Sequence, residues 1–475
     1  MKPDVRKLSL YIHIPFCKAK CSYCDFLSFD SCGYDRQRQY ISALCKEIEA
    51  YRTVAGDYLV TTIFIGGGTP SYIEADLIGQ VMQSIYKIFK VDPEAEITIE
   101  GNPDSLKTDK LKTYRQAGIN RLSIGLQSAN DDMLKMLGRV HDYDQFTEAY
   151  NSAREAGFSN INIDIMSGLP GETADSYMET LKKVSALEPE HISAYSLIVE
   201  ERTPLSGRQE LLELLPSEEE DRMLYAATKE RLKAEGYDRY EISNYAKEGF
   251  QCRHNIIYWT GGEYLGMGLG AASYLTVWLD DDKCEKIRFH GVEDLDEYIG
   301  RFLQCDGIQE DEYTNMYHFY ENENDLCGEM DFPDSATEDF SDVDDDYDMY
   351  EGMGFSLGMD IGMDGSSDKM EHNIQKYKEY ENSALLEFIR DYYKDLYFSK
   401  RKDEMEEFMF LGLRLIRGIL KAEFKERFGT AIERVYGEVI EKYKERGLLI
   451  EQEGRLFLSD KGIDVSNVIM AEFML

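Results

Sequence analysis

The chain of 475 residues contains no long hydrophobic run. No stretch approaches the roughly 18 consecutive apolar residues that a membrane-spanning helix requires, which excludes a transmembrane segment. The early apolar run Leu8–Phe16 is interrupted by His13 and Pro15, and no small-residue cleavage site follows it. It therefore lacks the pattern of a secretory signal. We expect a protein that begins at Met1 and is located in the cytoplasm.

Basic residues are also scarce, because 53 Lys and Arg stand against 91 Asp and Glu, a net charge of −38. Nucleic-acid binding depends on basic patches that neutralise phosphates, so this composition disfavours a nucleic-acid partner. The acidic excess is concentrated in Asp306–His372, which holds 22 acidic residues and one lysine. Within it, Asp306–Ser367 is Gly-rich and shows no apolar periodicity, which predicts a disordered acidic insert.

The nine cysteines are an odd number, which disfavours a disulfide framework in a cytosolic chain and favours metal or cluster ligation. Three of them, Cys17, Cys21 and Cys24, follow one another within a single short loop. A zinc site needs a fourth ligand at tetrahedral spacing, and none accompanies them. Three thiolates suit three corners of a [4Fe–4S] cube, whose fourth iron remains open to chelate a small molecule. The sequence therefore predicts an iron–sulfur cluster with one free coordination site.

Short β-branched runs alternate with helical segments through the first 200 residues. The expected strands are Leu8–His13, Thr62–Ile65, Glu96–Glu100, Arg121–Gly125, Asn160–Ile165 and His191–Leu197. The expected helices are Arg36–Tyr51, Ala75–Phe89, Lys110–Ala117, Tyr143–Ala156 and Ser176–Leu187, with a further one at Glu218–Glu235. This alternation predicts parallel strands with helices outside them, in either a doubly wound sheet or a barrel. In both architectures the functional loops lie at the carboxyl ends of the strands.

After the insert, Met405–Leu415 and Ala431–Arg446 have the spacing of amphipathic helices, and Leu448–Glu451 with Leu456–Ser459 predicts a small hairpin. A last helix is expected near the C-terminus. This is the outline of a winged-helix-like module. Acidic residues on its helices favour a packing or docking role over DNA binding.

Polar residues recur where the expected strands end. Gly66–Pro70 follows the second strand, and its glycines allow a ligand to approach backbone N–H groups closely. Glu100 ends the third strand, Gln127 follows the fourth and Asp164 lies within the fifth, while Arg139 lies in the next loop. Because the carboxyl ends of parallel strands meet at one edge, these side chains are expected to converge on one mouth.

The cysteine loop resembles the signature of radical S-adenosylmethionine (SAM) proteins, in which the amino and carboxylate groups of SAM occupy the open iron. Within that superfamily the chain is similar to the coproporphyrinogen-dehydrogenase-like family, through the phrases Leu10–Cys17, Ile65–Pro70, Thr98–Pro103, Arg121–Ser128, Asp164–Thr173 and Tyr240–Tyr245. The similarity covers Leu8 to about Ser273 and resumes at Glu406, and it is silent over the acidic insert. It implies an α/β fold, a partial (βα)6-type radical SAM barrel with a small C-terminal winged-helix-like α+β domain.

The resemblance also implies a division of the chain and a set of site residues. The barrel is expected at 1–235, a barrel-closing segment at 236–305, the acidic low-complexity insert at 306–383 and the C-terminal domain at 384–475. Cys17, Cys21 and Cys24 are implied to hold the [4Fe–4S] cluster. The residues implied to line the SAM site are Tyr11, Gly67, Gly68, Thr69, Glu100, Gln127, Arg139 and Asp164.

The family contains oxygen-independent coproporphyrinogen III dehydrogenases and a sister group of heme chaperones. The dehydrogenases have a further cysteine where this chain has Phe26, and a long arm where only sixteen residues precede Cys17. The chaperones have a His-Asn-x-x-Tyr-Trp motif, which His254–Trp259 matches.

An imidazole is a common ligand of heme iron, and aromatic rings pack on a porphyrin. We therefore expect the residues of this motif, placed where they can reach the mouth, to contact heme: His254, Asn255, Tyr258 and Trp259. The alternative is a structural histidine with aromatic neighbours that fill a core.

The resemblance therefore implies a heme chaperone that binds heme, SAM and a [4Fe–4S] cluster and passes heme to a client hemoprotein. We expect this client to be a respiratory, membrane-associated protein. Two alternatives stay open. One is a coproporphyrinogen dehydrogenase that forms a radical from SAM. The other is a radical enzyme that modifies nucleic acid through its C-terminal module, which the acidity of the chain disfavours.

Overall fold

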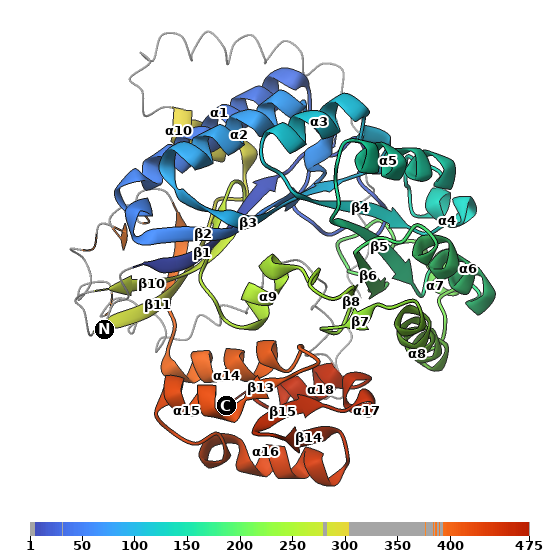
Figure 1. The fold of residues 1–475 in the computed structure, drawn as a ribbon, viewed down its shortest axis with the longest axis vertical. Helices are drawn as coiled ribbons and strands as arrows, with labels where there is room; N and C mark the ends of the chain where they lie inside the picture. The colour runs from blue at the N-terminus through green and yellow to red at the C-terminus, as the bar shows by residue number, and fades with distance from the viewer. Residues whose placement is uncertain are drawn as a thin grey trace, which may run out of the picture.

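The computed structural model describes residues 5–30, 32–278, 283–303 and 393–474, together with five isolated positions between 376 and 389. Its main body is a curved sheet covered on the outside by helices, and a smaller domain lies against it (Figure 1). The predicted insert Asp306–Ser367 lies outside the described residues. Among the helices of the described part, none is both long and apolar enough to cross a membrane.

Six parallel strands form the centre of the sheet, and they are neighbours in the order in which they occur along the chain. They are β1 (Arg6–Ile14), β2 (Tyr58–Gly67), β3 (Lys90–Gly101), β4 (Arg121–Gln127), β5 (Ile161–Ser167) and β6 (His191–Ser196). A doubly wound sheet reverses its strand order at a switch point. This sheet does not, so the partial barrel is confirmed and the doubly wound alternative is excluded.

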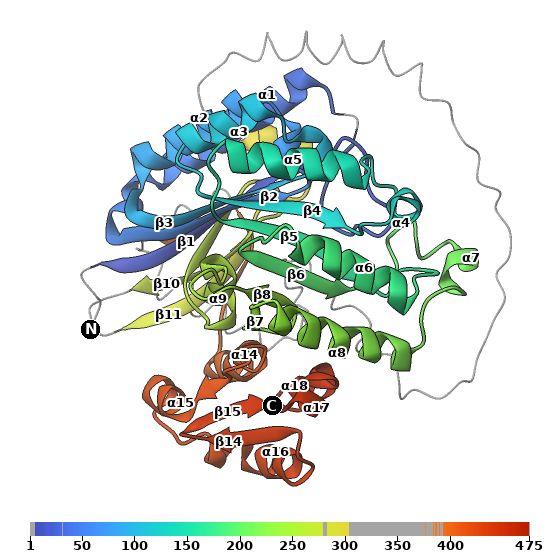
Figure 2. The same cartoon turned by 45° about the vertical axis from the view of Figure 1, so that its right-hand side comes forward.

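Right-handed crossovers that all advance in one direction place the connecting helices on one face of the sheet. Figure 2 shows them along the outer side of the barrel. They are α1 (Tyr34–Ala50), α2 (Ala75–Ile88), α3 (Thr108–Gln116), α4 (Asp131–Met136), α5 (Tyr143–Glu155), α6 (Ala174–Ser185) and α8 (Glu218–Ala234). Two of them begin at complete capping boxes, with Asp142 starting α5 and Ser217 starting α8.

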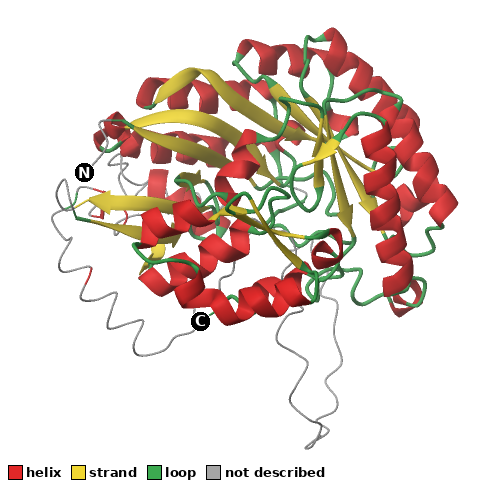
Figure 3. Cartoon of the chain, turned by 60° about the horizontal axis from the view of Figure 1, so that its bottom comes forward, coloured by secondary structure: helices red, strands yellow, loops and turns green. Residues whose placement is uncertain are grey.

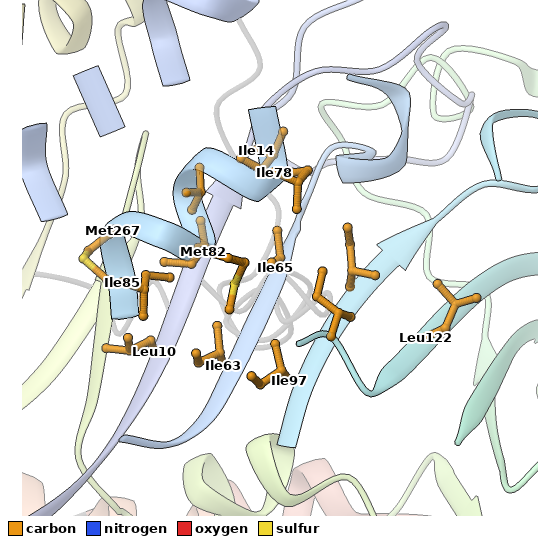
Figure 4. Close-up of a cluster of buried hydrophobic side chains, with 14 of the residues drawn as sticks. Leu10, Ile14, Ile63, Ile65, Ile78, Met82, Ile85, Ile97, Leu122 and Met267 are labelled. Carbon is orange, nitrogen blue, oxygen red and sulfur yellow. The ribbon is translucent and has the colours of Figure 1, made fainter. Parts of the chain in front are cut away.

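Alternation along the strands separates an apolar outer face from a polar inner one. Leu10 of β1 and Ile63 of β2 pack beneath Met82 and Ile85 of α2, and none of the four is more than 1% exposed (Figure 4). Inner positions instead carry hydrogen-bonding groups, as where Asn162 Nδ2 of β5 donates to the hydroxyl of Ser123 on β4, at 2.7 Å. The outer face therefore supplies the core, and the inner face is available for function.

The sheet extends beyond the six predicted strands, to twelve strands among the described residues. Next to β1 it continues with β9 (Tyr264–Met267), β10 (Ala272–Trp278), β11 (Cys284–His290) and β12 (Lys394–Phe398), and next to β6 with β8 (Asn244–Ala246) and β7 (Asp238–Arg239). β11 and β12 pair with each other although a long segment separates them in the chain. All of these added strands except β12 lie in the segment 236–305, which the resemblance implied to close the barrel and in which no strand was predicted.

The C-terminal domain contains the predicted helices and hairpin, together with two short helices and a short strand that were not predicted. Its elements are α14 (Arg401–Gly412), β13 (Ile419–Leu420), α15 (Lys421–Phe428), α16 (Glu433–Glu445), β14 (Leu449–Gln452), β15 (Arg455–Leu458), α17 (Asp460–Ile463) and α18 (Ser466–Ala471). Figure 3, coloured by secondary structure, shows the C-terminus among helices. The backbone N–H of Ile416 donates to the Tyr240 carbonyl at 3.0 Å and so ties the domain to the barrel.

A buried carboxylate joins α1 to two distant parts of the chain. Glu47 is fully buried and accepts hydrogen bonds from the Gly268 backbone N–H at 2.8 Å and from the hydroxyls of Tyr298 and Tyr393. Tyr298 lies on α10 (Leu295–Leu303), and Tyr393 directly precedes β12. Burial raises the pKa of Glu47 to about 7, although these three donors oppose the rise.

We expect Glu47 to make the protein less stable as the pH rises. Because its pKa is higher in the folded state than the ordinary 4.5, the folded state binds the proton more tightly. This contribution is complete below about pH 4.5 and is lost as the pH rises through 7, with a magnitude of the order of 3 kcal/mol. Denaturant unfolding between pH 5 and 8 should show a loss of stability in the parent that Glu47→Gln lacks. Parallel pH profiles of the two proteins would contradict this.

Candidate functional site

The cysteine loop follows β1 and is fixed by its own backbone. The Cys17 N–H donates to the Phe29 carbonyl at 2.9 Å, and the Cys24 N–H donates to the Cys21 carbonyl at 3.2 Å. The Ser22 N–H reaches the Leu137 carbonyl beyond α4, at 3.1 Å. The three predicted ligands therefore lie on one loop at the carboxyl end of the barrel strands.

Two side chains donate hydrogen bonds to the sulfur atoms. Thr69 Oγ1 donates to Cys17 Sγ and Arg139 Nη1 donates to Cys21 Sγ, both at 3.5 Å. Burial raises the pKa of Cys17, and it raises that of Cys24 to about 11. Deprotonating these thiols therefore requires nearby positive charge, which an iron cluster supplies.

The thiols are not gathered around a point. In the part of the chain that the structure describes, no three His, Cys, Asp or Glu side chains are grouped as a single metal ion requires. Zinc therefore gains no support from this loop. Three free thiols on one loop, with a hydroxyl and a guanidinium directed at two of them, form a donor set that fits a larger cluster.

The glycine-rich turn after β2 packs closely against the start of the cysteine loop. A Cβ on Gly68 would lie 3.0 Å from the Phe16 backbone, and the Gly68 N–H donates to the Ile14 carbonyl at 2.9 Å. Gly67 has a φ of +114°, and its N–H donates to Glu100 Oε2 at 3.2 Å. Contacts within the protein therefore already require glycine at positions 67 and 68. This requirement is additional to their predicted role, in which the absence of a side chain lets a ligand approach the backbone.

We expect Gly67→Ala to be destabilising by about 1–3 kcal/mol. Its Cβ would lie 2.6 Å from the His13 ring, on a backbone that disfavours side chains. A suitable control is Gly79→Ala within α2, where nothing lies within 4 Å of the added Cβ and alanine favours the helix. Thermal unfolding compares the two variants, and equal melting temperatures would contradict the prediction.

Two half-buried carboxyl groups, those of Glu100 and Asp164, lie below the turn. Burial, reinforced by the charge of Asp164, raises the pKa of Glu100 to about 8. Burial also raises the pKa of Asp164, which accepts hydrogen bonds from Asn162 Nδ2 at 2.7 Å and Ser123 Oγ at 3.1 Å. Carboxylates of this kind can accept hydrogen bonds from hydroxyl or ammonium groups of a ligand.

Arg139 connects the acidic part of the mouth to the cysteine loop. Its Nη2 donates to Asn102 Oδ1 at 2.7 Å and to the Gly125 carbonyl at 2.6 Å, while Nη1 is 3.5 Å from the Tyr23 hydroxyl. Asn102 in turn donates to Thr69 Oγ1 at 3.2 Å. Asn102 and Tyr23 are the site residues that the sequence analysis missed. Both lie within or beside the motif phrases, but only their contacts reveal a role.

Two further predicted residues have unusual environments. Gln127 has a φ of +74°, which non-glycine residues rarely adopt and which is typical of strained functional positions. The Tyr11 hydroxyl is hydrogen-bonded to His13 Nδ1 at 3.0 Å, and His13 Nε2 lies 2.8 Å from the Leu27 carbonyl. His13 therefore links the first strand to the cysteine loop.

The predicted heme residues lie elsewhere. His254, on α9 (Arg253–Trp259), is fully buried, with Nδ1 2.8 Å from Thr62 Oγ1 and Nε2 2.9 Å from the Tyr258 hydroxyl. Thr62 precedes Gly67 by five residues on β2, about 16 Å along a strand. The motif therefore lies inside the barrel and not at its mouth, contrary to the expectation that it reaches the cysteine loop.

The aromatic faces of the motif are covered by protein. Trp259 is 6% exposed, with the Arg414 guanidinium 4.6 Å above its ring, and Tyr258 packs edge-on against Tyr264. Asn255 is half-buried. Burial, followed by the Arg121 charge, lowers the pKa of His254 to about 3, so its ring is neutral. This arrangement favours the structural alternative, and heme contact by these four residues stays a prediction that requires the packing to open.

Comparisons with known proteins agree with this geometry. Residues 11–184 match the radical SAM superfamily, and residues 400–465 match the HemN C-terminal domain. The heme chaperone HemW of Bacillus subtilis (strain 168) is 30% identical over 472 residues, which cover 98% of this chain and 99% of that protein. This chain belongs to the heme chaperone HemW family.

Other heme chaperones HemW match a shorter part of this chain at higher identity. The Haemophilus influenzae protein is 38% identical over 278 residues, covering 58% of this chain and 72% of its own. The Escherichia coli (strain K12) protein is 37% identical over 269 residues, which cover 57% of this chain and 70% of that protein.

A solved structure of a different protein shares the fold. Coproporphyrinogen III oxidase (HemN) from Escherichia coli superposes with a TM-score of 0.70 at 20% identity, covering 100% of this chain and 91% of that one. At this identity the similarity establishes the architecture and not the reaction.

Proposed function

We propose that this chain is a heme chaperone that binds heme and transfers it to client hemoproteins, with a [4Fe–4S] cluster and SAM bound at the barrel mouth. The observation that carries the proposal is the similarity to the Bacillus subtilis heme chaperone, which extends over 98% of this chain. The barrel alone would be compatible with many reactions. The similarity also includes the C-terminal domain, so it extends over both the barrel and this second domain.

The residues at the mouth have the chemistry that the cofactors need. Cys17, Cys21 and Cys24 would ligate three irons, and the donors on Thr69 and Arg139 would stabilise the negative sulfur atoms. A reduced cluster of this type supplies the electron that cleaves SAM in radical enzymes. The SAM site proposed from the sequence consists of Tyr11, Gly67, Gly68, Thr69, Glu100, Gln127, Arg139 and Asp164.

The position of Phe26 supports the chaperone over the dehydrogenase. Phe26 lies on the cysteine loop and is 43% exposed, so no thiol is available where the dehydrogenases have a further cysteine. An exposed phenylalanine at this point is also suited to contact an apolar ligand.

Anaerobic reconstitution tests the proposal. Protein loaded with iron, sulfide and SAM should bind heme, which a Soret band reports. It should then pass the heme to an apo-hemoprotein that can be separated from it after mixing. It should not decarboxylate coproporphyrinogen III with SAM and a reductant. Porphyrinogen turnover without heme transfer would instead establish the dehydrogenase.

For the client, we propose a respiratory hemoprotein associated with the membrane, as the family resemblance implies. Heme-loaded protein mixed with membrane vesicles that contain heme-free respiratory complexes should lose its heme to them. Vesicles without those complexes are the control. Equal loss to both would contradict a specific client.

A further inference from the structure

A chain of side-chain hydrogen bonds joins two of the three loop thiols through Asn102, the residue directly after β3. On one side, Asn102 Nδ2 donates to Thr69 Oγ1 at 3.2 Å, and Thr69 Oγ1 donates to Cys17 Sγ at 3.5 Å. On the other side, Arg139 Nη2 donates to Asn102 Oδ1 at 2.7 Å, and Arg139 Nη1 donates to Cys21 Sγ at 3.5 Å. One amide therefore holds both of these donors to the sulfur atoms.

The donors and acceptors in this chain can be assigned in only one direction. Arginine has no acceptor atom, so the Arg139 guanidinium fixes the oxygen of the Asn102 amide toward itself and the NH2 group toward Thr69. The Thr69 hydroxyl has a single proton. Because its oxygen accepts from Asn102, that proton is directed at Cys17 Sγ. The amide thus determines to which atom the threonine donates.

The backbone of Asn102 is held independently of its side chain. Its N–H donates to Ser71 Oγ at 3.1 Å, and its carbonyl accepts from the Ser105 N–H at 3.0 Å and from the Ser105 hydroxyl at 2.9 Å. Arg139 also has a second anchor, because it donates to the Gly125 carbonyl at 2.6 Å. Replacing the amide should therefore leave the fold in place and change only the orientation of the two donors.

We propose that Asn102 is a positioning residue that sets the reduction potential of the cluster. This inference rests on the part of the proposed function that makes Cys17 and Cys21 ligands of the [4Fe–4S] cluster. Hydrogen bonds to the sulfur atoms stabilise the more negative, reduced state and so raise the potential. By holding Thr69 and Arg139 in their donating orientations, the Asn102 amide keeps the cluster easier to reduce.

Aspartate at this position distinguishes the proposal from a purely steric role. A carboxylate has nearly the shape of the amide and still accepts from Arg139, but it has no proton to donate. The Thr69 hydroxyl would then donate to the carboxylate oxygen, a stronger acceptor than sulfur, and withdraw its proton from Cys17. Asn102→Asp should therefore lower the potential although the side-chain volume is retained.

The test is the midpoint potential of the reconstituted cluster in the full chain, followed by electron paramagnetic resonance during an anaerobic redox titration. Asn102→Ala and Asn102→Asp should both lower the potential. For Asn102→Asp we expect about a tenfold change in the reduction equilibrium, which is about 59 mV for one electron. Iron content and melting temperature should match those of the parent. The matched control is Asn120→Ala, because Asn120 bonds to the backbone of Ala95 and Ile97 earlier in β3, and its potential should equal that of the parent.

A double-variant comparison shows whether the effect passes through the threonine. Thr69→Val removes the hydroxyl and should itself lower the potential. Adding Asn102→Ala to Thr69→Val should then produce a smaller further shift than Asn102→Ala produces in the parent. Equal shifts in the two backgrounds, or parent potentials in both Asn102 variants, would overturn the inference while the cluster and the proposed function stand. If the parent itself assembles no cluster, the thiols are misassigned, and that part of the proposed function fails together with the inference.

Discussion

Replacing Cys17, Cys21 and Cys24 together by alanine should abolish both the iron–sulfur cluster and SAM binding. Each thiol supplies one corner ligand, and the SAM amino and carboxylate groups have no iron to chelate once the cluster is absent. Iron analysis and Mössbauer spectra of the reconstituted parent should show about four irons per chain, and those of the triple variant close to none. SAM binding, followed by equilibrium dialysis, should fall in parallel.

The matched controls are single alanine variants of cysteines outside the loop. Cys45 lies on α1, and Cys284 is exposed on β11, so neither lies on the loop with the three thiols. Both variants should keep the full iron content and bind SAM normally. Normal cluster content in the triple variant, or its loss in Cys45→Ala, would show that the ligands have been misassigned.

The second large effect concerns stability and not heme. His254→Ala should lower the free energy of unfolding by about 3–5 kcal/mol. The substitution leaves the hydroxyls of Thr62 and Tyr258 without their imidazole partner and opens a cavity beneath Phe64, whose ring stacks on the imidazole with centroids 5.2 Å apart. The Trp259–Arg414 contact on the same helix couples this loss to the C-terminal domain.

Thermal and denaturant unfolding of His254→Ala, beside His290→Ala on β11, provides the comparison. The second variant should change stability by no more than about 0.5 kcal/mol, because its ring is half-buried near the sheet edge. If instead His254→Ala retains the parent melting temperature but loses heme affinity, this result would support the direct heme contact that the His-Asn-x-x-Tyr-Trp motif predicts.

The sequence by itself determined the order and type of most elements and the location of the mouth. The alternation of apolar and polar residues around Leu10 and Ile63 indicates strands with one apolar face. The start of α5 is also encoded locally, by the capping box of Asp142 and Gln145. Motif spacing placed Cys17, Cys21 and Cys24 on one loop and Glu100 at the end of a strand. These properties depend on neighbours in the chain, which is why a single sequence contains them.

Only the tertiary structure decided which groups meet and which are already satisfied. The ring hydrogen bonds of His254 come from β2 and from its own helix, and those of Glu47 come from segments more than 200 residues away in the chain. Partners of this kind are set by the packing of distant segments, and no local pattern encodes them.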